Sequence, residues 1–132
     1  MSVKIRVRSG TIMESFTKIS WAILALIHVS PALSTLKPKL IERLYGIAPQ
    51  GDMGVLMTHR GFLFLAMFAT CIIAIFSLES RKLASIILSI SVLSFLFLYT
   101  KAGLPSGPLR KIAIADVVGL LPLAFVIWQS WK

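Results

Sequence analysis

Four ionisable side chains lie inside long apolar runs of this sequence: His28, His59, Arg60 and Asp116. A charged group in hydrocarbon is costly, so such a residue marks either a functional site or a packing site. A guanidinium and a carboxylate can satisfy each other through two parallel hydrogen bonds. We therefore expect Arg60 and Asp116 to pair directly, with the two histidines donating to or accepting from the same polar network.

The apolar runs that carry these residues predict membrane-spanning helices. Hydrophobic residues make up 57% of the 132 residues, and charged residues only 14%. A helix of about 20 apolar residues is long enough to cross a bilayer. The expected spans are residues 16–34, 54–78, 83–100 and 110–131. The predicted fold class is all-α, an integral membrane four-helix bundle of up-down-up-down topology that forms one domain over residues 16–132.

The segments outside the spans have their own signals. Residues 1–15 are basic and are expected to form a disordered or interfacial tail, with Met13 as an alternative start. Between the first two spans, Pro38 and Gly46 bound an amphipathic pattern that predicts a short interfacial helix. We expect the first span to be retained rather than cleaved as a signal peptide, because His28 and Pro31 interrupt its apolar run.

The ionisable residues are expected to lie at similar depths. With a rise of about 1.5 Å per residue, each lies roughly 9 Å below the membrane face that carries the loop after the first span. Tyr99, at the end of the third span, reaches nearly the same level and is a further candidate. The sequence therefore predicts one buried polar cluster that draws on all four spans.

This cluster is compatible with more than one function. We favour an accessory or structural membrane component, in which polar contacts fix how the helices pack. The alternative is binding or transport of a small anionic, lipid-like or quinone-like molecule at the mouth of the bundle, held by Arg60. A proton relay through histidine and aspartate also stays open. Catalysis is disfavoured and no catalytic residue is predicted, because the common phosphate-loop, serine-nucleophile and zinc-enzyme motifs are absent.

No metal site and no cofactor are predicted. The two histidines could in principle ligate haem iron or another metal. However, Arg60 next to His59 repels a cation, and no cysteine or second carboxylate lies nearby to complete a ligand set.

The net charge of +9 bears on the partners. The basic residues flank the apolar runs, so the expected partners are the lipid bilayer and its anionic headgroups at the basic loops. Nucleic acid is not expected, because no basic face with interleaved aromatic residues lies outside the spans. A homo-oligomer or a membrane-protein partner is left open. Lysine and arginine are evenly divided between the two ends of the bundle, and the first helix favours cytoplasmic termini.

Short motifs in a fixed order suggest a family. They are LIHVSP at 26–31, LYG at 44–46, LMTHR at 56–60 and AD at 115–116. In this order they resemble a group of small bacterial four-helix inner-membrane proteins with a loosely DoxX-like architecture. The resemblance implies a multi-pass protein of the cell inner (cytoplasmic) membrane. Some members are named phosphopantetheine adenylyltransferase, but this chain has neither the H-x-G-H-type motif nor the soluble α/β domain on which that activity relies.

Overall fold

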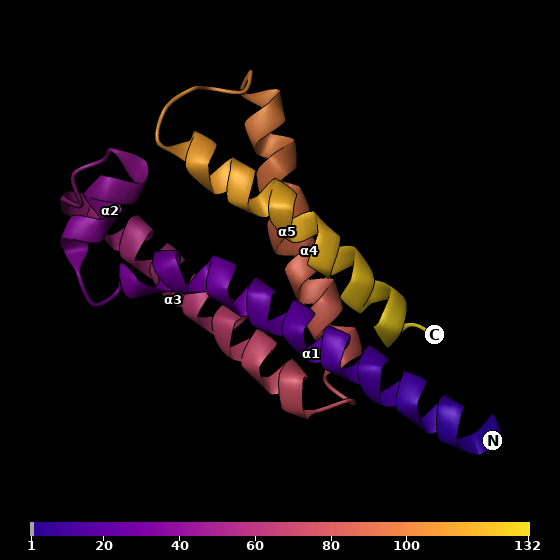
Figure 1. Ribbon diagram of the computed structural model, residues 1–132. Helices are drawn as coiled ribbons and strands as arrows, with labels where there is room; N and C mark the ends of the chain where they lie inside the picture. Colours follow the sequence, from indigo (N-terminus) through magenta and orange to yellow (C-terminus); the bar gives the residue numbers. More distant parts are fainter. Residues whose placement is uncertain (1) are drawn as a thin grey trace.

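The computed structural model describes the backbone of residues 2–132 and the side chains of residues 10–132. This part of the chain is all-helical and contains no strand. Its helices are α1 (Ser2–Leu33), α2 (Pro38–Tyr45), α3 (Gly51–Phe76), α4 (Arg81–Lys101) and α5 (Leu109–Ser130) (Figure 1). The predicted all-α class is therefore confirmed.

Four of these helices are long and apolar enough to cross a membrane. They comprise the Gly10–Leu33 part of α1 and the whole of α3, α4 and α5. Large apolar side chains lie exposed on each of them, such as Leu26 at 68%, Phe76 at 81% and Leu121 at 78%. Exposed apolar surface on this scale marks a membrane or protein contact. The chain therefore has the features of a multi-pass membrane protein.

The first helix begins earlier than the sequence suggested. Residues 2–15, expected as a tail, form the first part of α1, which continues without a break to Leu33. Its first proline is Pro31, in the last turn, so no residue before that point removes a backbone donor from the helix. The early start places Glu14 on a helical face, where it contacts another helix.

The short helix predicted between Pro38 and Gly46 is present as α2. Pro38 stands in its first turn, where the missing N–H is no loss. Gly46 ends the helix with φ at +66°, a left-handed conformation that glycine adopts without strain, and its N–H donates to the carbonyl of Glu42. Ile41 and Tyr45 are buried against the rest of the protein. Thus α2 brings one aromatic side chain to the bundle.

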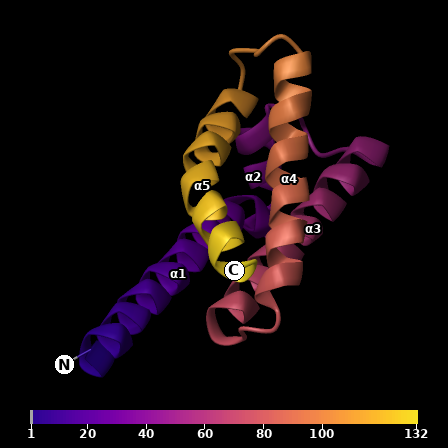
Figure 2. The same cartoon turned by 90° about the vertical axis from the view of Figure 1, so that its right-hand side faces the viewer.

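The long helices pack in the spatial order α3, α1, α5 and α4. Helix α1 packs most closely against α3 and also against α5, while α4 packs against α5 (Figures 1 and 2). The core between them contains Trp21, Leu24, Cys71, Leu88, Leu123 and Val126. Contact between α3 and α4 is slight. This weak contact leaves room for a cavity between these two helices.

Two glycines let neighbouring helices approach α1 closely. A Cβ at Gly61 of α3 would lie 2.6 Å from Oγ of Ser34, and one at Gly119 of α5 would lie 2.8 Å from Cδ1 of Ile27. Real Cβ atoms essentially never come so close. Gly61 follows Arg60, and Gly119 lies one turn after Asp116. Close packing at Gly61 therefore constrains the backbone next to Arg60, whereas at Gly119 the flexible end of Ile27 can adjust.

Candidate functional site

Arg60 lies among three aromatic rings. Its guanidinium carbon is 5.2 Å from the ring centroid of Phe64 on the same helix, 5.6 Å from that of Tyr45 on α2 and 6.0 Å from that of Phe95 on α4. Cation–π attraction at these distances stabilises the charge. Its Nε is nevertheless buried without a hydrogen-bond partner. The rings hold the guanidinium in place but leave its donors unused.

Asp116 does not form the expected direct pair with Arg60. Within the described residues, the only ion pair with a nitrogen–oxygen distance of 4.0 Å or less joins Arg81 to Glu14. Asp116 is buried on α5, at 8% exposure, and its carboxylate accepts no hydrogen bond from the described residues. The depth expected for Asp116 is compatible with its position on α5. The guanidinium of Arg60, however, contacts the aromatic rings and not this carboxylate.

Both charged residues nevertheless line one cavity. This cavity has a volume of about 170 Å³ and lies between α3, α4 and α5, with Phe64 and Phe95 in its walls. Asp116 also lines a second cavity of about 190 Å³, together with Ser30 of α1. Arg60 also lines a third of about 170 Å³, together with Tyr45. Hence Arg60 and Asp116 stand where small cavities meet.

His28 is buried next to this site but is bonded to its own helix. Its Nδ1 lies 2.7 Å from the carbonyl oxygen of Leu24, which can only accept, so Nδ1 carries the proton and donates it. Its ring packs against Phe64 with 5.8 Å between centroids. His28 makes no hydrogen bond to Arg60 or Asp116 in the described part of the chain. It therefore supports the wall of the site through Phe64.

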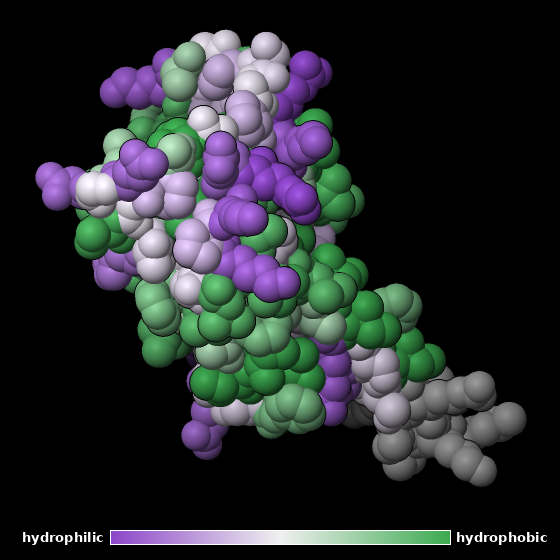
Figure 3. Space-filling model, turned by 90° about the vertical axis from the view of Figure 1, so that its left-hand side faces the viewer, coloured by the Kyte–Doolittle hydropathy of each residue, from purple (hydrophilic) through white to green (hydrophobic). Residues whose placement is uncertain are grey.

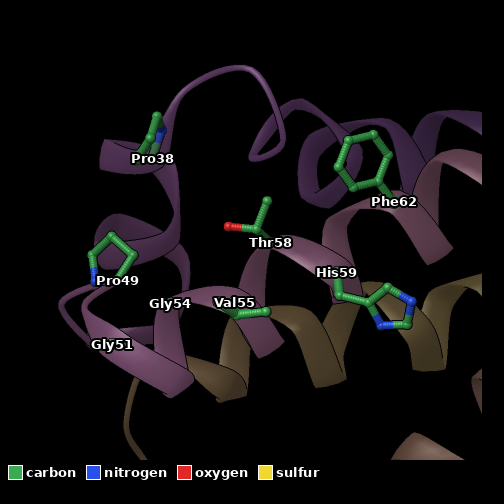
Figure 4. A pocket seen from close by; sticks show the side chains of 8 residues that line it. All are labelled: Pro38, Pro49, Gly51, Gly54, Val55, Thr58, His59 and Phe62. Atoms are coloured by element: carbon green, nitrogen blue, oxygen red, sulfur yellow. The ribbon is translucent and has the colours of Figure 1, made fainter.

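His59 lies outside the buried cluster in which the sequence placed it. Its side chain is exposed and lines a surface pocket with Thr58 and Phe62, near the start of α3 (Figure 4). Consecutive residues of a helix point about 100° apart, because a turn takes 3.6 residues. An inward Arg60 therefore turns His59 outward.

Tyr99 serves the connection between α4 and α5. Its hydroxyl donates to the carbonyl of Pro105 over 2.6 Å, and its ring stacks on Phe95 at 6.1 Å between centroids. It lines a different, larger cavity that Arg60 and Asp116 do not reach. Tyr99 therefore touches the cluster only through Phe95.

The two histidines do not face a common space. His28 is buried in α1, whereas His59 is exposed on α3 and lines a surface pocket. Among residues 10–132, no three histidine, cysteine, aspartate or glutamate side chains gather as potential metal ligands.

A second polar network was not predicted from the sequence. Arg81, at the start of α4, donates to both carboxylate oxygens of Glu14 over 2.9 and 2.7 Å. Its Nε donates to the carbonyl of Ala74 over 2.8 Å, and one Nη donates to that of Ile75 over 3.3 Å. Glu14 is the only acidic residue before Glu42, and that isolation was the available signal.

Comparison of the chain with protein-family models, with curated proteins and with solved structures finds no match. The function of the site therefore rests on its own geometry. Two charged groups of opposite sign line one cavity, and neither makes a hydrogen bond to the described residues. Such groups offer both donors and acceptors to a molecule that enters the cavity.

Proposed function

We propose that this protein binds a small amphiphilic molecule within the membrane, in the cavity between α3, α4 and α5, and that Arg60 holds the polar head of that molecule. The observation that carries this proposal is that Arg60 and Asp116 share a cavity without pairing. Arg60 attracts Asp116 across the cavity, but a buried polar group that lacks a hydrogen bond is destabilising. Groups that served only to hold helices together would be expected to satisfy each other.

The surroundings of the cavity favour an amphiphile over a water-soluble solute. Leu63 of α3 and Leu98 of α4 line the cavity and are 52% and 60% exposed. Because these helices touch only slightly, the cavity opens between them onto a surface suited to hydrocarbon. A head group can enter sideways while its apolar tail stays among the lipid chains.

The membrane setting is part of the same proposal. The four long helices cross the bilayer in up-down-up-down order, with α2 on the surface. Both termini face the cytoplasm, and the membrane is the bacterial inner membrane implied by the resemblance to DoxX-like proteins. The exposed basic residues contact anionic headgroups. They include Lys37, Lys39, Arg43, Lys101, Arg110 and Lys111.

The purely structural role favoured from the sequence suits Arg81 better than Arg60. All the interactions of Arg81 are internal, and its side chain is only 7% exposed. Arg60 instead keeps a buried donor without a partner. The geometry therefore favours the binding alternative at Arg60.

The test is to purify the full chain in mild detergent and identify bound molecules by native mass spectrometry. Arg60→Met removes the charge but keeps an apolar side chain among the rings. We expect an amphiphile on the unaltered protein and at least a tenfold loss in the variant, a change of about 1.4 kcal/mol. Arg43 of α2 is exposed and does not line the cavity, so Arg43→Met is the matched control and should leave binding in the cavity unchanged. Failure of the unaltered protein to retain any added amphiphile would refute the proposal.

A further inference from the structure

The cavity between α3, α4 and α5 has walls of opposite charge. Arg60 lies on one side of it and Asp116 on another, and their charged atoms are more than 4.0 Å apart. Lys111, the other cation that lines a cavity with Asp116, is exposed and makes no ion pair in the described part of the chain. Asp116 is therefore a buried carboxylate that Arg60 attracts across the cavity, but to which no described residue donates a hydrogen bond.

This arrangement discriminates between classes of head group. A purely anionic head would satisfy Arg60, but it would leave the Asp116 carboxylate unpaired and repelled by the bound charge. A neutral quinone-like head could accept a hydrogen bond from Arg60, yet it would compensate neither charge. A quaternary ammonium head brings a positive charge but has no N–H to donate to a carboxylate. A head with an anion and a hydrogen-bonded cation makes a charge-assisted hydrogen bond to each of the two residues, and these are the strongest hydrogen bonds that the cavity can offer.

On the basis of the proposed function, we infer that the ligand has a zwitterionic head that carries a phosphate or carboxylate and a primary ammonium. The anionic group binds the guanidinium of Arg60, and the ammonium donates to the carboxylate of Asp116. An aminophospholipid such as phosphatidylethanolamine has this chemistry. The aromatic walls of Phe64 and Phe95 exclude water and strengthen both contacts.

The membrane setting favours the lipid over the free zwitterion. The cavity opens between exposed apolar side chains of α3 and α4, where acyl chains would lie. In the face seen in Figure 3, most hydrophilic residues lie in the upper half, and apolar residues make up most of the described surface below them. A head group that reaches Arg60 and Asp116 from the bilayer keeps its tail on such apolar surface.

The test measures lipid binding to the full chain by native mass spectrometry, with phosphatidylethanolamine and phosphatidylglycerol of identical acyl chains. We expect phosphatidylethanolamine to bind about tenfold or more tightly than phosphatidylglycerol, which lacks the ammonium. Asp116→Asn should weaken phosphatidylethanolamine binding about tenfold and leave phosphatidylglycerol binding unchanged or stronger. Asp52→Asn, at an exposed carboxylate in the first turn of α3, should change neither.

A lipid series on the unaltered chain gives a second measurement that does not depend on how Asp116→Asn folds. Stepwise N-methylation of phosphatidylethanolamine removes N–H donors one at a time, so binding should fall at each step. Soluble phosphoethanolamine in the same assay distinguishes the sources. If phosphoethanolamine binds as tightly as the lipid, the ligand is the free zwitterion. If phosphoethanolamine binds more weakly, the ligand is the lipid. Either result supports the zwitterionic head.

The two proposals fail in different ways. Equal binding of phosphatidylethanolamine, its methylated forms and phosphatidylglycerol, with all of it lost in Arg60→Met, would overturn the zwitterionic head. That result would leave amphiphile binding through Arg60 intact. The absence of binding by every lipid in the series would overturn the proposed function itself.

Discussion

Two arginines of this protein, Arg81 and Arg60, lie where several helices meet, yet their surroundings differ. Arg81 donates hydrogen bonds to Glu14 of α1 and to two carbonyls near the end of α3. Arg60 is surrounded by rings and lines cavities, without a hydrogen bond to the described residues. The last carbonyls of a helix lack partners within it, whereas mid-helix carbonyls are already bonded. Arg81 of α4 finds acceptors because it lies beside the end of α3. Arg60 lies within α3, where the carbonyls are already bonded.

The largest expected effect follows from removing the satisfied arginine. Arg81→Leu deletes its internal hydrogen bonds and leaves Glu14 without its partner. Glu14 is 40% exposed, so water compensates part of that loss. We expect the free energy of unfolding to fall by about 2–4 kcal/mol. Thermal unfolding in detergent measures this, with Arg43→Leu as an exposed control. A loss below about 0.5 kcal/mol would mean that the network is not structural.

The next effect should appear in binding and not in stability. Arg60→Leu removes a charge that has no hydrogen-bond partner in the described chain, and it keeps apolar volume among the rings. We expect the stability to change by less than about 1 kcal/mol, while amphiphile binding falls about tenfold or more. Unfolding and native mass spectrometry on the same preparation separate these outcomes. If Arg60→Leu destabilised the protein as much as Arg81→Leu, both arginines would be structural and the contrast between them would be wrong.

A smaller effect is expected from Glu14→Gln. The amide can still accept one hydrogen bond from Arg81, and the site of Glu14 is partly exposed. We expect a loss of about 0.5–1 kcal/mol. Measured together with Arg81→Leu and the double variant, it gives the coupling between these two residues. Additive losses would show that the pair contributes no coupling and that the carbonyl contacts dominate.

The smallest effect should follow from Tyr99→Phe. This change deletes the hydrogen bond to Pro105 but retains the stacking on Phe95. Because this hydrogen bond is exposed to solvent, we expect a loss of at most about 0.5 kcal/mol in the free energy of unfolding, with unchanged lipid binding. A binding loss as large as that of Arg60→Leu would place Tyr99 in the site, contrary to its position here.

The helices were predictable from the sequence because their signals are local. The lengths of the apolar runs locate the four long helices, and Pro38 and Gly46 bound α2. The side-chain contacts were not predictable, because depth along a helix does not fix the direction in which a residue points. Arg60 and His59 are neighbours at one depth, yet one faces the rings and the other faces outward.

The missing pair and the missed network have the same physical origin. Matched depth brings Arg60 and Asp116 to one cavity, but whether they touch depends on how α3 and α5 rotate and on what else lies within reach. Glycine contacts set this packing, and no periodic pattern reveals them. Arg81 and Glu14 belong to segments that were read as a connection and a tail, so their pairing depended on the helical start of α1.

The slight contact between α3 and α4 has a mechanical consequence. These helices are joined by the short segment 77–80, where the hydroxyls of Ser77 and Ser80 are hydrogen-bonded, and Arg81 ties the start of α4 to the end of α3. Helices α3 and α4 are therefore linked firmly at this end and make few contacts with each other at the opposite end. Spreading the free ends breaks few direct contacts between α3 and α4. Lateral pressure from the surrounding acyl chains should therefore set the width of the opening beside Arg60.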